Sequence, residues 1–326
     1  MACFDEKKTS VILHSLSSLK QLKTLVLDGI VSSTDHAIEL SLTLDSIAPS
    51  IRLLSLANCS LSDHLNERFL RSLSRASGLQ TLNMSRNELG YAGCQSISKI
   101  LRKFPLLKSL DLHSNSIVNA DPVISILPPS LEELDISENR ISENNIETLS
   151  GFFKHSCFKL KSLKLSVQNI TSTRMMHHFL RNFEKLLLLE EIVLFNEEKE
   201  IVQPFFHILT HLPHLKKLSI HGNLDDNFWD SLGLLENITH LSLDSTSIIQ
   251  DGSFGNLCEA ISHLHHLRYL SFQNNFMDLS HVRELLAVLI DCKSFIHLDI
   301  RSNCDKFDFY SFVSSFARST NIRVLM

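Results

Sequence analysis

The stretch "LKSLDLHSN", from Leu107 to Asn115, carries the pattern that decides the fold. Leucine occupies positions one, four and six and asparagine occupies position nine, whereas polar residues fill the positions between them. Apolar residues at positions four and six are typical of a short strand with one buried face. The polar residues at positions three, five and seven are therefore expected on the opposite face of the strand.

The same pattern recurs along the whole chain. Full copies begin at Leu22, Ile51, Leu79, Leu107, Leu131, Leu160, Leu189, Leu215, Ile238, Leu267 and Phe295, and a truncated copy begins at Ile322. Their mean spacing of about 27 residues lies within the range of leucine-rich repeats. Apolar residues at helical spacing lie between the strands, for example Val282, Leu285 and Leu289. Because one strand and one helix cannot bury both apolar faces alone, neighbouring copies are expected to stack.

The copy "LQTLNMSRNELGYAGCQSISKILRKFPLL", from Leu79 to Leu107, carries Leu89-Gly90 and Gly93 between its strand and its helix. With these residues the chain resembles the leucine-rich repeat family, and its long repeats are similar to those of the ribonuclease-inhibitor subfamily. The resemblance implies an α/β solenoid, a horseshoe with a parallel concave sheet and a mostly helical convex face. Strands about 4.8 Å apart stacked with helices about 8 to 10 Å apart are also expected to curve toward the strands. We predict one domain, residues 1–326, with a truncated twelfth repeat at Ile322–Met326.

Asparagine at position nine is expected to pair the backbone groups of the turn that follows each strand, because a buried amide both donates and accepts. This predicted ladder consists of Asn87, Asn115, Asn139, Asn223, Asn275 and Asn303. Glu197 does not fit the position and predicts an irregular turn around residues 196–200. Two short repeats, which begin at Leu107 and Leu215, predict abbreviated convex segments, and Pro128 and Pro129 exclude a continuous helix in the first of them.

Composition limits the classes of function. The chain has 326 residues, of which 44% are hydrophobic and 21% charged, and its formal net charge is -5. Its Lys and Arg residues are scattered, so we predict no nucleic-acid partner and no membrane partner. Neither a signal peptide nor an apolar run of about 18 residues is evident, and seven cysteines without a CxxC pair favour reduced thiols. These features predict a soluble, cytoplasmic protein.

Chemical motifs are weak. His207, His211 and His214 have a spacing that zinc could use, but no Glu follows His207 and Pro213 bends the chain, so we predict no metal site and solvent-facing histidines. Glycine loops and Gly-x-Ser-x-Gly motifs are absent from the sequence, which predicts no catalytic residues, no cofactor and no small-molecule substrate.

A cluster of carboxylates leaves two alternatives. Glu132, Glu133, Asp135 and Glu138 lie next to Asp111 if the strands stack. The cluster is either an acidic patch for a basic partner or an ordinary solvated face, and the solvated face is the favoured interpretation.

The sequence favours a non-catalytic scaffold that binds a partner protein on its concave face. His240, Tyr269 and His297 occupy position three of three consecutive repeats and are expected to form one row, with Asp299 at position five and Arg301 at position seven beside it. Tyr and Arg on a preformed surface are typical of binding hot spots. A second candidate patch contains Val193 and Phe195, apolar residues at positions where Ser or Asp usually stands.

Three alternatives stay open. The first is regulation of a small GTPase, since Ran GTPase activators are similar in fold, although their acidic tail is missing here. The second is a sensor or adaptor role within a larger receptor or ubiquitin-ligase complex. The third is a host-directed bacterial effector. The last repeat stops inside a strand, so we expect the chain to be a fragment or an incomplete gene product.

Overall fold

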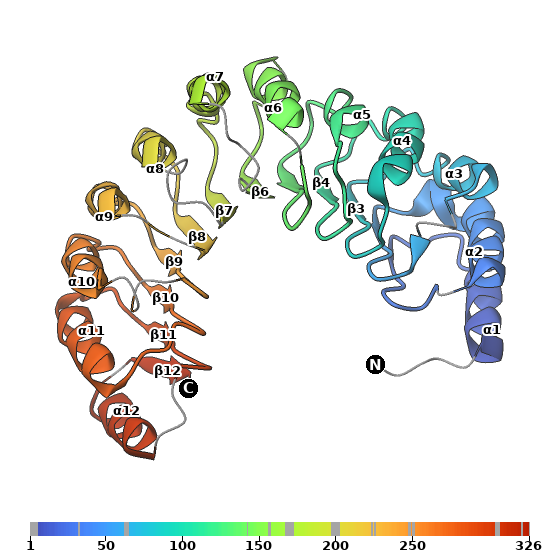
Figure 1. Ribbon diagram of the computed structural model, residues 1–326. Coiled ribbons are helices and arrows are strands. Elements are labelled where there is room, and N and C mark those ends of the chain that lie inside the picture. The colour runs from blue at the N-terminus through green and yellow to red at the C-terminus, as the bar shows by residue number, and fades with distance from the viewer. Residues whose placement is uncertain are drawn as a thin grey trace. The chain divides into compact units, whose positions relative to one another are not determined.

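The computed structural model describes residues 6–31, 33–61, 65–141, 143–155, 158–166, 173–196, 203–222, 224, 226–246, 249, 252–303, 307–320 and 322–325 (Figure 1). The chain divides into two compact units, Met1–Leu186 and Leu187–Met326. Each unit is an α/β solenoid in which a short strand alternates with a helix. The single domain over residues 1–326 stays a prediction.

The first unit contains strands β1 to β6, each paired in parallel with the next strand along the chain. These strands are β1 (Thr24–Val26), β2 (Leu53–Ser55), β3 (Thr81–Asn83), β4 (Ser109–Asp111), β5 (Glu133–Asp135) and β6 (Ser162–Ser166). Its helices are α1 (Glu6–Leu16), α2 (Thr34–Ile47), η1 (Ala48–Ser50), α3 (Glu67–Leu73), α4 (Gly90–Leu101), α5 (Asp121–Ile124), α6 (Glu143–His155) and α7 (Thr173–Phe183).

The second unit contains strands β7 to β12, again parallel and in chain order. These strands are β7 (Glu191–Asn196), β8 (Lys217–Gly222), β9 (His240–Ser242), β10 (Tyr269–Ser271), β11 (His297–Asp299) and β12 (Arg323–Leu325). Its helices are α8 (Gln203–Leu209), α9 (Asp226–Gly233), α10 (Phe254–Ser262), α11 (Leu279–Asp291) and α12 (Phe307–Ser319).

The register follows the sequence repeat except in β12. Val324 lies opposite Leu298, whereas a regular copy that begins at Ile322 would place Leu325 there. One residue fewer separates Ile322 from the paired strand than in the other repeats, and Leu325 is consequently 40% exposed.

Leucine at position four forms the core of both units. Nine position-four leucines stack across the strands and are at most 1% exposed: Leu54, Leu82, Leu110, Leu134, Leu163, Leu218, Leu241, Leu270 and Leu298. Within each unit the helices lie on one side of the sheet (Figure 1). We call the other side, formed by side chains at positions three, five and seven, the strand face.

Asparagine at position nine holds the turns together, as Asn115 illustrates. Its Oδ1 accepts hydrogen bonds from the backbone of Asn87 and Leu89, and its Nδ2 donates to the carbonyl oxygens of Met84 and Leu112 at 2.9 Å. Equivalent bonds are formed by Asn87, Asn139, Asn275 and Asn303. Asn223 and the predicted turn at residues 197–200 lie outside the described residues, and Asn196 ends β7.

Of the two short repeats, the first has the shortest described α-helix, whereas the helix of the second is longer than α3 and α8, which have seven residues each. The four-residue helix α5 ends at Ile124, before Pro128 and Pro129, and α9 has eight residues. Pyrrolidine rings cannot continue a helix, which explains the irregular chain after α5.

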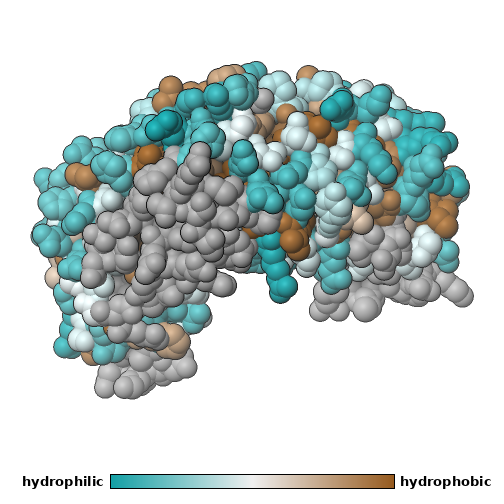
Figure 2. Space-filling model, turned by 45° about the horizontal axis from the view of Figure 1, so that its top comes forward, coloured by the Kyte–Doolittle hydropathy of each residue, from teal (hydrophilic) through white to brown (hydrophobic). Residues whose placement is uncertain are grey.

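Hydrophobic residues are interspersed with hydrophilic ones on the described surface seen in Figure 2. Within the described ranges, every helix is too short or too polar to span a bilayer.

Candidate functional site on the strand face of the second unit

Three rings lie side by side on the strand face of the second unit. Tyr269 on β10 is paired with His240 on β9 and with His297 on β11. The ring centroids of His240 and Tyr269 are 5.8 Å apart, and those of Tyr269 and His297 are 5.1 Å apart. The backbone register thus produces the predicted row. Its role in binding stays a prediction.

The row continues in both directions with charged residues. Lys217 on β8 lies opposite His240, and Glu191 on β7 lies opposite Lys217. On the other side Arg323 on β12 lies opposite His297. We call these six position-three residues, from Glu191 to Arg323, the second-unit row.

A hollow of about 240 Å³ joins the two candidate patches that the sequence treated separately. Val193, Lys217 and Ser219 line it together with His240 and Tyr269. These side chains meet only because β7 to β10 pair in register. The sequence of a single repeat therefore does not indicate that the two candidate patches are neighbours. The hollow offers an apolar contact beside polar groups.

Phe195 has a different environment from Val193. Its ring stacks on the imidazole of His221, with centroids 4.7 Å apart and planes inclined by 10°. Both side chains are half-buried. The ring packing favours a structural role for Phe195 within β7 and β8, and its proposed contact with a partner stays untested.

Asp299 lies beside the row with a buried carboxylate, and its contact with a partner stays a prediction. It is fully buried, because Arg301 donates to its two carboxylate oxygens at 2.9 and 2.7 Å and Gln273 donates to it at 3.1 Å. The ion pair raises the pKa of Arg301. Asp299 therefore orients the guanidinium, whose side chain remains 51% exposed.

The other carboxylate beside the row is also occupied. Asp244 accepts hydrogen bonds from Ser242, Ser271 and the backbone of Gln273, at 2.7 to 2.8 Å. These bonds connect β9 to β10 and hold the strand face rigid. A carboxylate with this many donors has little remaining capacity for a partner's cation.

His240 has a pKa below its ordinary value. Partial burial lowers its pKa, and the nearby positive charges of Lys217 and Arg268 lower it further, whereas Glu191 acts in the opposite direction. Its Nδ1 lies 2.9 Å from Thr239 Oγ1. The neutral imidazole is consequently favoured near neutral pH.

Lys216, Lys217 and Arg268 are not among the site residues predicted from the sequence. All three are exposed on the second unit, at positions two and three of their repeats. A comparison of position two across consecutive repeats, which gives Lys216, Thr239 and Arg268, contains the signal. The emphasis on aromatic residues at position three obscured it.

Two carboxylates of the acidic cluster in the first unit, Glu132 and Asp135, form ion pairs with lysines. Glu132 lies 2.8 Å from both Lys108 and Lys161, and these bonds lower its pKa to about 2. Lys164 lies 3.5 Å from Asp135. Burial raises the pKa of Asp111, which stands opposite Asp135. These ion pairs favour the solvated-face interpretation over an acidic patch for a basic partner.

His207, His211 and His214, which have a spacing that zinc could use, are not placed together as metal ligands in the described residues. The rings of His207 and His211 are 5.3 Å apart and inclined by 72°. His214 is exposed after Pro213. In the part of the chain that the structure describes, no group of three or more His, Cys, Asp or Glu side chains is placed to hold a metal ion.

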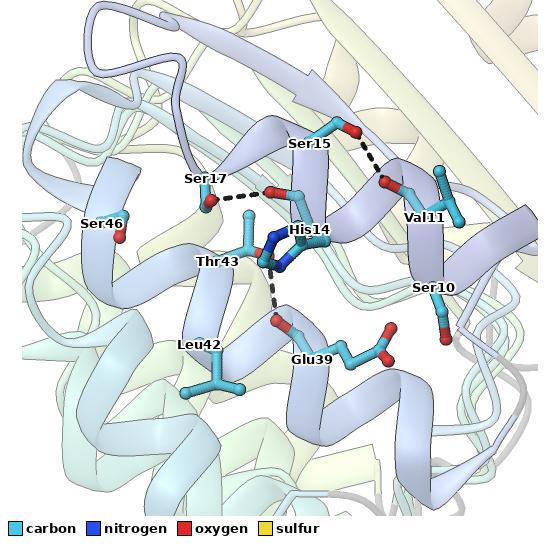
Figure 3. A pocket seen from close by; sticks show the side chains of 9 residues that line it. All are labelled: Ser10, Val11, His14, Ser15, Ser17, Glu39, Leu42, Thr43 and Ser46. Atoms are coloured by element: carbon cyan, nitrogen blue, oxygen red, sulfur yellow. Dashed lines mark hydrogen bonds between the residues drawn. The ribbon is translucent and has the colours of Figure 1, made fainter.

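A hollow of about 640 Å³ lies along α1 and α2 in the first unit (Figure 3). The Thr43 hydroxyl donates to the carbonyl oxygens of Leu13 and Glu39 at 2.8 and 2.9 Å. Val11 and Leu42, which are 65% and 49% exposed, add apolar surface. The Thr43 hydroxyl is therefore occupied by backbone carbonyls, although it lines the hollow.

Comparisons with known proteins agree with the repeat pattern. A sequence model of the family Leucine Rich Repeat matches residues 130–152. NACHT, LRR and PYD domains-containing protein 14 of Mus musculus is 26% identical over 268 residues, which cover 78% of this chain and 27% of that protein. The chain thus spans about a quarter of the length of this curated relative.

Two solved structures are distant likenesses. The tropomodulin C-terminal domain of Caenorhabditis elegans is 11% identical, covers 54% of this chain and 99% of its own, and has a TM-score of 0.37. An internalin of Listeria monocytogenes is 14% identical, covers 92% of this chain and 95% of its own, and has a TM-score of 0.43.

Proposed function

Because this chain belongs to the leucine-rich repeat family, we propose that it is a non-catalytic binding module whose second-unit strand face contacts a partner protein. Proteins of this kind generally act as scaffolds for protein interactions, because stacked repeats present a large preformed surface. The ribonuclease-inhibitor-like subtype and the cytoplasmic location stay predictions.

The row of His240, Tyr269 and His297 carries the proposal. The three rings are ordered by strand pairing before any partner arrives, so little side-chain entropy is lost on binding. Tyrosine buries a large area with few rotatable bonds, which is why it is frequent at hot spots. The adjacent hollow lined by Val193 would receive an apolar side chain.

The buried thiols are consistent with a binding role. Burial raises the pKa of Cys94 and of Cys258 to about 12, so both thiols are protonated near neutral pH. A protonated thiol is a poor nucleophile. This observation concerns these two cysteines, and the absence of catalysis stays part of the proposal.

The test is a capture experiment with matched baits. Wild-type chain, Tyr269→Ala and Ser109→Ala are used to capture proteins from the same lysate, and the captured proteins are identified by mass spectrometry. Ser109 occupies position three of a first-unit repeat and is the matched control. A protein retained by Ser109→Ala and lost by Tyr269→Ala supports the proposal, whereas capture that is identical for all three baits contradicts it.

Regulation of a small GTPase is a separate hypothesis with its own test. GTP hydrolysis is measured with and without the chain. Stimulation that persists in Tyr269→Ala would place the regulatory contact away from the second-unit row.

A further inference from the structure

We propose that the second unit binds an acidic, carboxylate-rich segment of a partner protein along the edge where its strands begin, with carboxylates seated between Lys216 and Arg268 at position two and Lys217 at position three. This inference rests on the proposed function and adds the chemistry of the partner. The bound segment would cross β8, β9 and β10.

The first observation is that these cations are unpaired. Lys216, Lys217 and Arg268 are exposed, and none forms an ion pair with a residue that the structure describes. In the first unit, by contrast, Lys108 and Lys161 share Glu132. A cation without an internal partner is available for a carboxylate from outside.

The second observation is a hollow of about 300 Å³ between two of these cations. Lys216, Thr239 and Arg268 line it, together with Pro213, Asn237, His266 and Ser294. The amide groups of His240 and Tyr269 donate to the carbonyl oxygens of Lys216 and Thr239, which sets the three position-two residues on consecutive strands. Lys216 and Arg268 are thus two strands apart, or about 10 Å between backbones, which both side chains can span to reach one carboxylate.

The neighbouring carboxylates of the second unit form no described ion pair with these three cations. Asp244 is occupied by donors from β9 and β10, and Asp299 is bound to Arg301. Glu191 stands opposite Lys217 at the β7 edge of the row. We therefore expect an acidic segment to lie across β8 to β11. Glu191 would repel it at β7.

A peptide fits this surface better than a nucleic acid does. The chain carries a formal net charge of -5, which repels a long polyanion at a distance. The hollow lined by Val193 and Tyr269 lies beside the cations through their shared neighbour Lys217 and suits an apolar side chain. Alternating acidic and apolar side chains would match both features.

The experiment uses the full chain and a fluorescein-labelled peptide of alternating Glu and Leu residues, with a Gln and Leu peptide as the neutral probe. Binding is measured by fluorescence anisotropy at low and at high salt. The Glu peptide is expected to bind, to weaken as salt rises, and to bind more tightly than the Gln peptide. Lys217→Gln and Arg268→Gln are each expected to weaken it about three- to tenfold.

Lys99→Gln is the matched control, because Lys99 is exposed on α4 of the first unit and its removal changes the net charge equally. If Lys99→Gln weakened binding of the Glu peptide equally, the effect would come from the net charge of the chain alone. That result would overturn the inference. The same holds if the two peptides bind equally, if neither binds, or if a labelled single-stranded oligonucleotide binds more tightly through Lys217 and Arg268. Melting temperatures of all variants check that they remain folded.

The two proposals fail differently. A captured partner that depends on Tyr269 but not on Lys217 or Arg268 would leave the proposed function intact and overturn the acidic segment. Capture that is independent of Tyr269 would overturn the proposed function itself.

Discussion

Position three of the repeat has opposite chemistry in the two units. The first unit places Thr24, Leu53, Thr81, Ser109, Glu133 and Ser162 there, and the second places Glu191, Lys217, His240, Tyr269, His297 and Arg323. The strands and the register are alike, but one row is mostly small hydroxyl residues and the other is aromatic and charged. A position that the fold leaves free is the place where binding specificity resides.

Charge pairing differs in the same way. Glu132 and Asp135 form ion pairs with three lysines of the first unit, whereas Lys216, Lys217 and Arg268 of the second unit have no described ionic partner. The described ion pairs of these lysines thus lie within the first unit, and the proposed partner would supply the carboxylates for the second.

The largest expected effect concerns the asparagine ladder. Asn115→Ala should lower the free energy of unfolding by about 2 to 3 kcal/mol, because it removes the partners of several buried backbone groups. In the second unit Thr246→Val should lower the free energy of unfolding by only about 1 kcal/mol. Its hydroxyl donates to Asn275 Oδ1 and to the carbonyl oxygen of Leu243, and only these bonds of the side chain are lost. Urea unfolding measures both values, and equal losses would show that the two ladders are equivalent.

The second prediction separates the two rows. Tyr269→Ala should weaken a captured partner by about 1 to 3 kcal/mol, and Ser109→Ala should leave its affinity unchanged. Tyr269→Ala should reduce stability by less than about 1.5 kcal/mol, because only contacts with the two neighbouring imidazoles are lost. Calorimetric binding and thermal melting are measured on the same samples, and a stability loss larger than the affinity loss would mean that Tyr269 is a core residue.

The third prediction uses the pKa of His240. Burial, Lys217 and Arg268 lower this pKa and Glu191 opposes them, so the imidazole is mainly neutral near pH 7 and becomes charged as the pH falls. Affinity for the Glu and Leu peptide should therefore rise a few-fold between about pH 7 and pH 5.5. His240→Gln should remove much of this rise. His155→Gln, at the exposed end of α6 in the first unit, should not.

The smallest expected effect is on the acid stability of the first unit. The pKa of Glu132 is lowered to about 2 by Lys108 and Lys161, so its stabilising contribution is present above its ordinary pKa and is lost as the pH falls toward 2. Glu132→Gln should lower stability at neutral pH by less than about 1 kcal/mol, as is usual for exposed ion pairs, and should leave stability at pH 2 unchanged. Lys217→Gln, which breaks no described ion pair, should not lower stability; a loss equal to that of Glu132→Gln would contradict the contrast in pairing.

Most of the fold was predictable because its signals are local. Alternation at positions four and six predicts strand and buried face from one repeat, and Pro128 and Pro129 predict the short α5 without neighbours. The row of His240, Tyr269 and His297 followed from counting alone, since parallel strands in register place equal positions side by side. The irregular end of the chain did not follow, because one residue fewer precedes β12.

The site was less predictable because it depends on which side chains reach across strands. Asp299 resembles any other polar residue at position five, and only the guanidinium of Arg301 makes its burial possible. Val193 joins the hollow of His240 and Tyr269 through the strands between them. Nothing in the seventh repeat alone indicates this contact.

The sequence by itself determined the repeat, the strand register before β12 and the asparagine at position nine, because each depends on periodicity along the chain. Only the tertiary structure decided the backbone around that asparagine: Arg86, Ser114, Asn274 and Ser302, which precede it, adopt positive φ angles of 53 to 59° although none is glycine. Such conformations are costly for residues with a Cβ and persist where surrounding bonds hold them. The tertiary structure likewise decided which charges are paired, because an ion pair requires two side chains within about 4 Å, a distance that no one-dimensional spacing specifies.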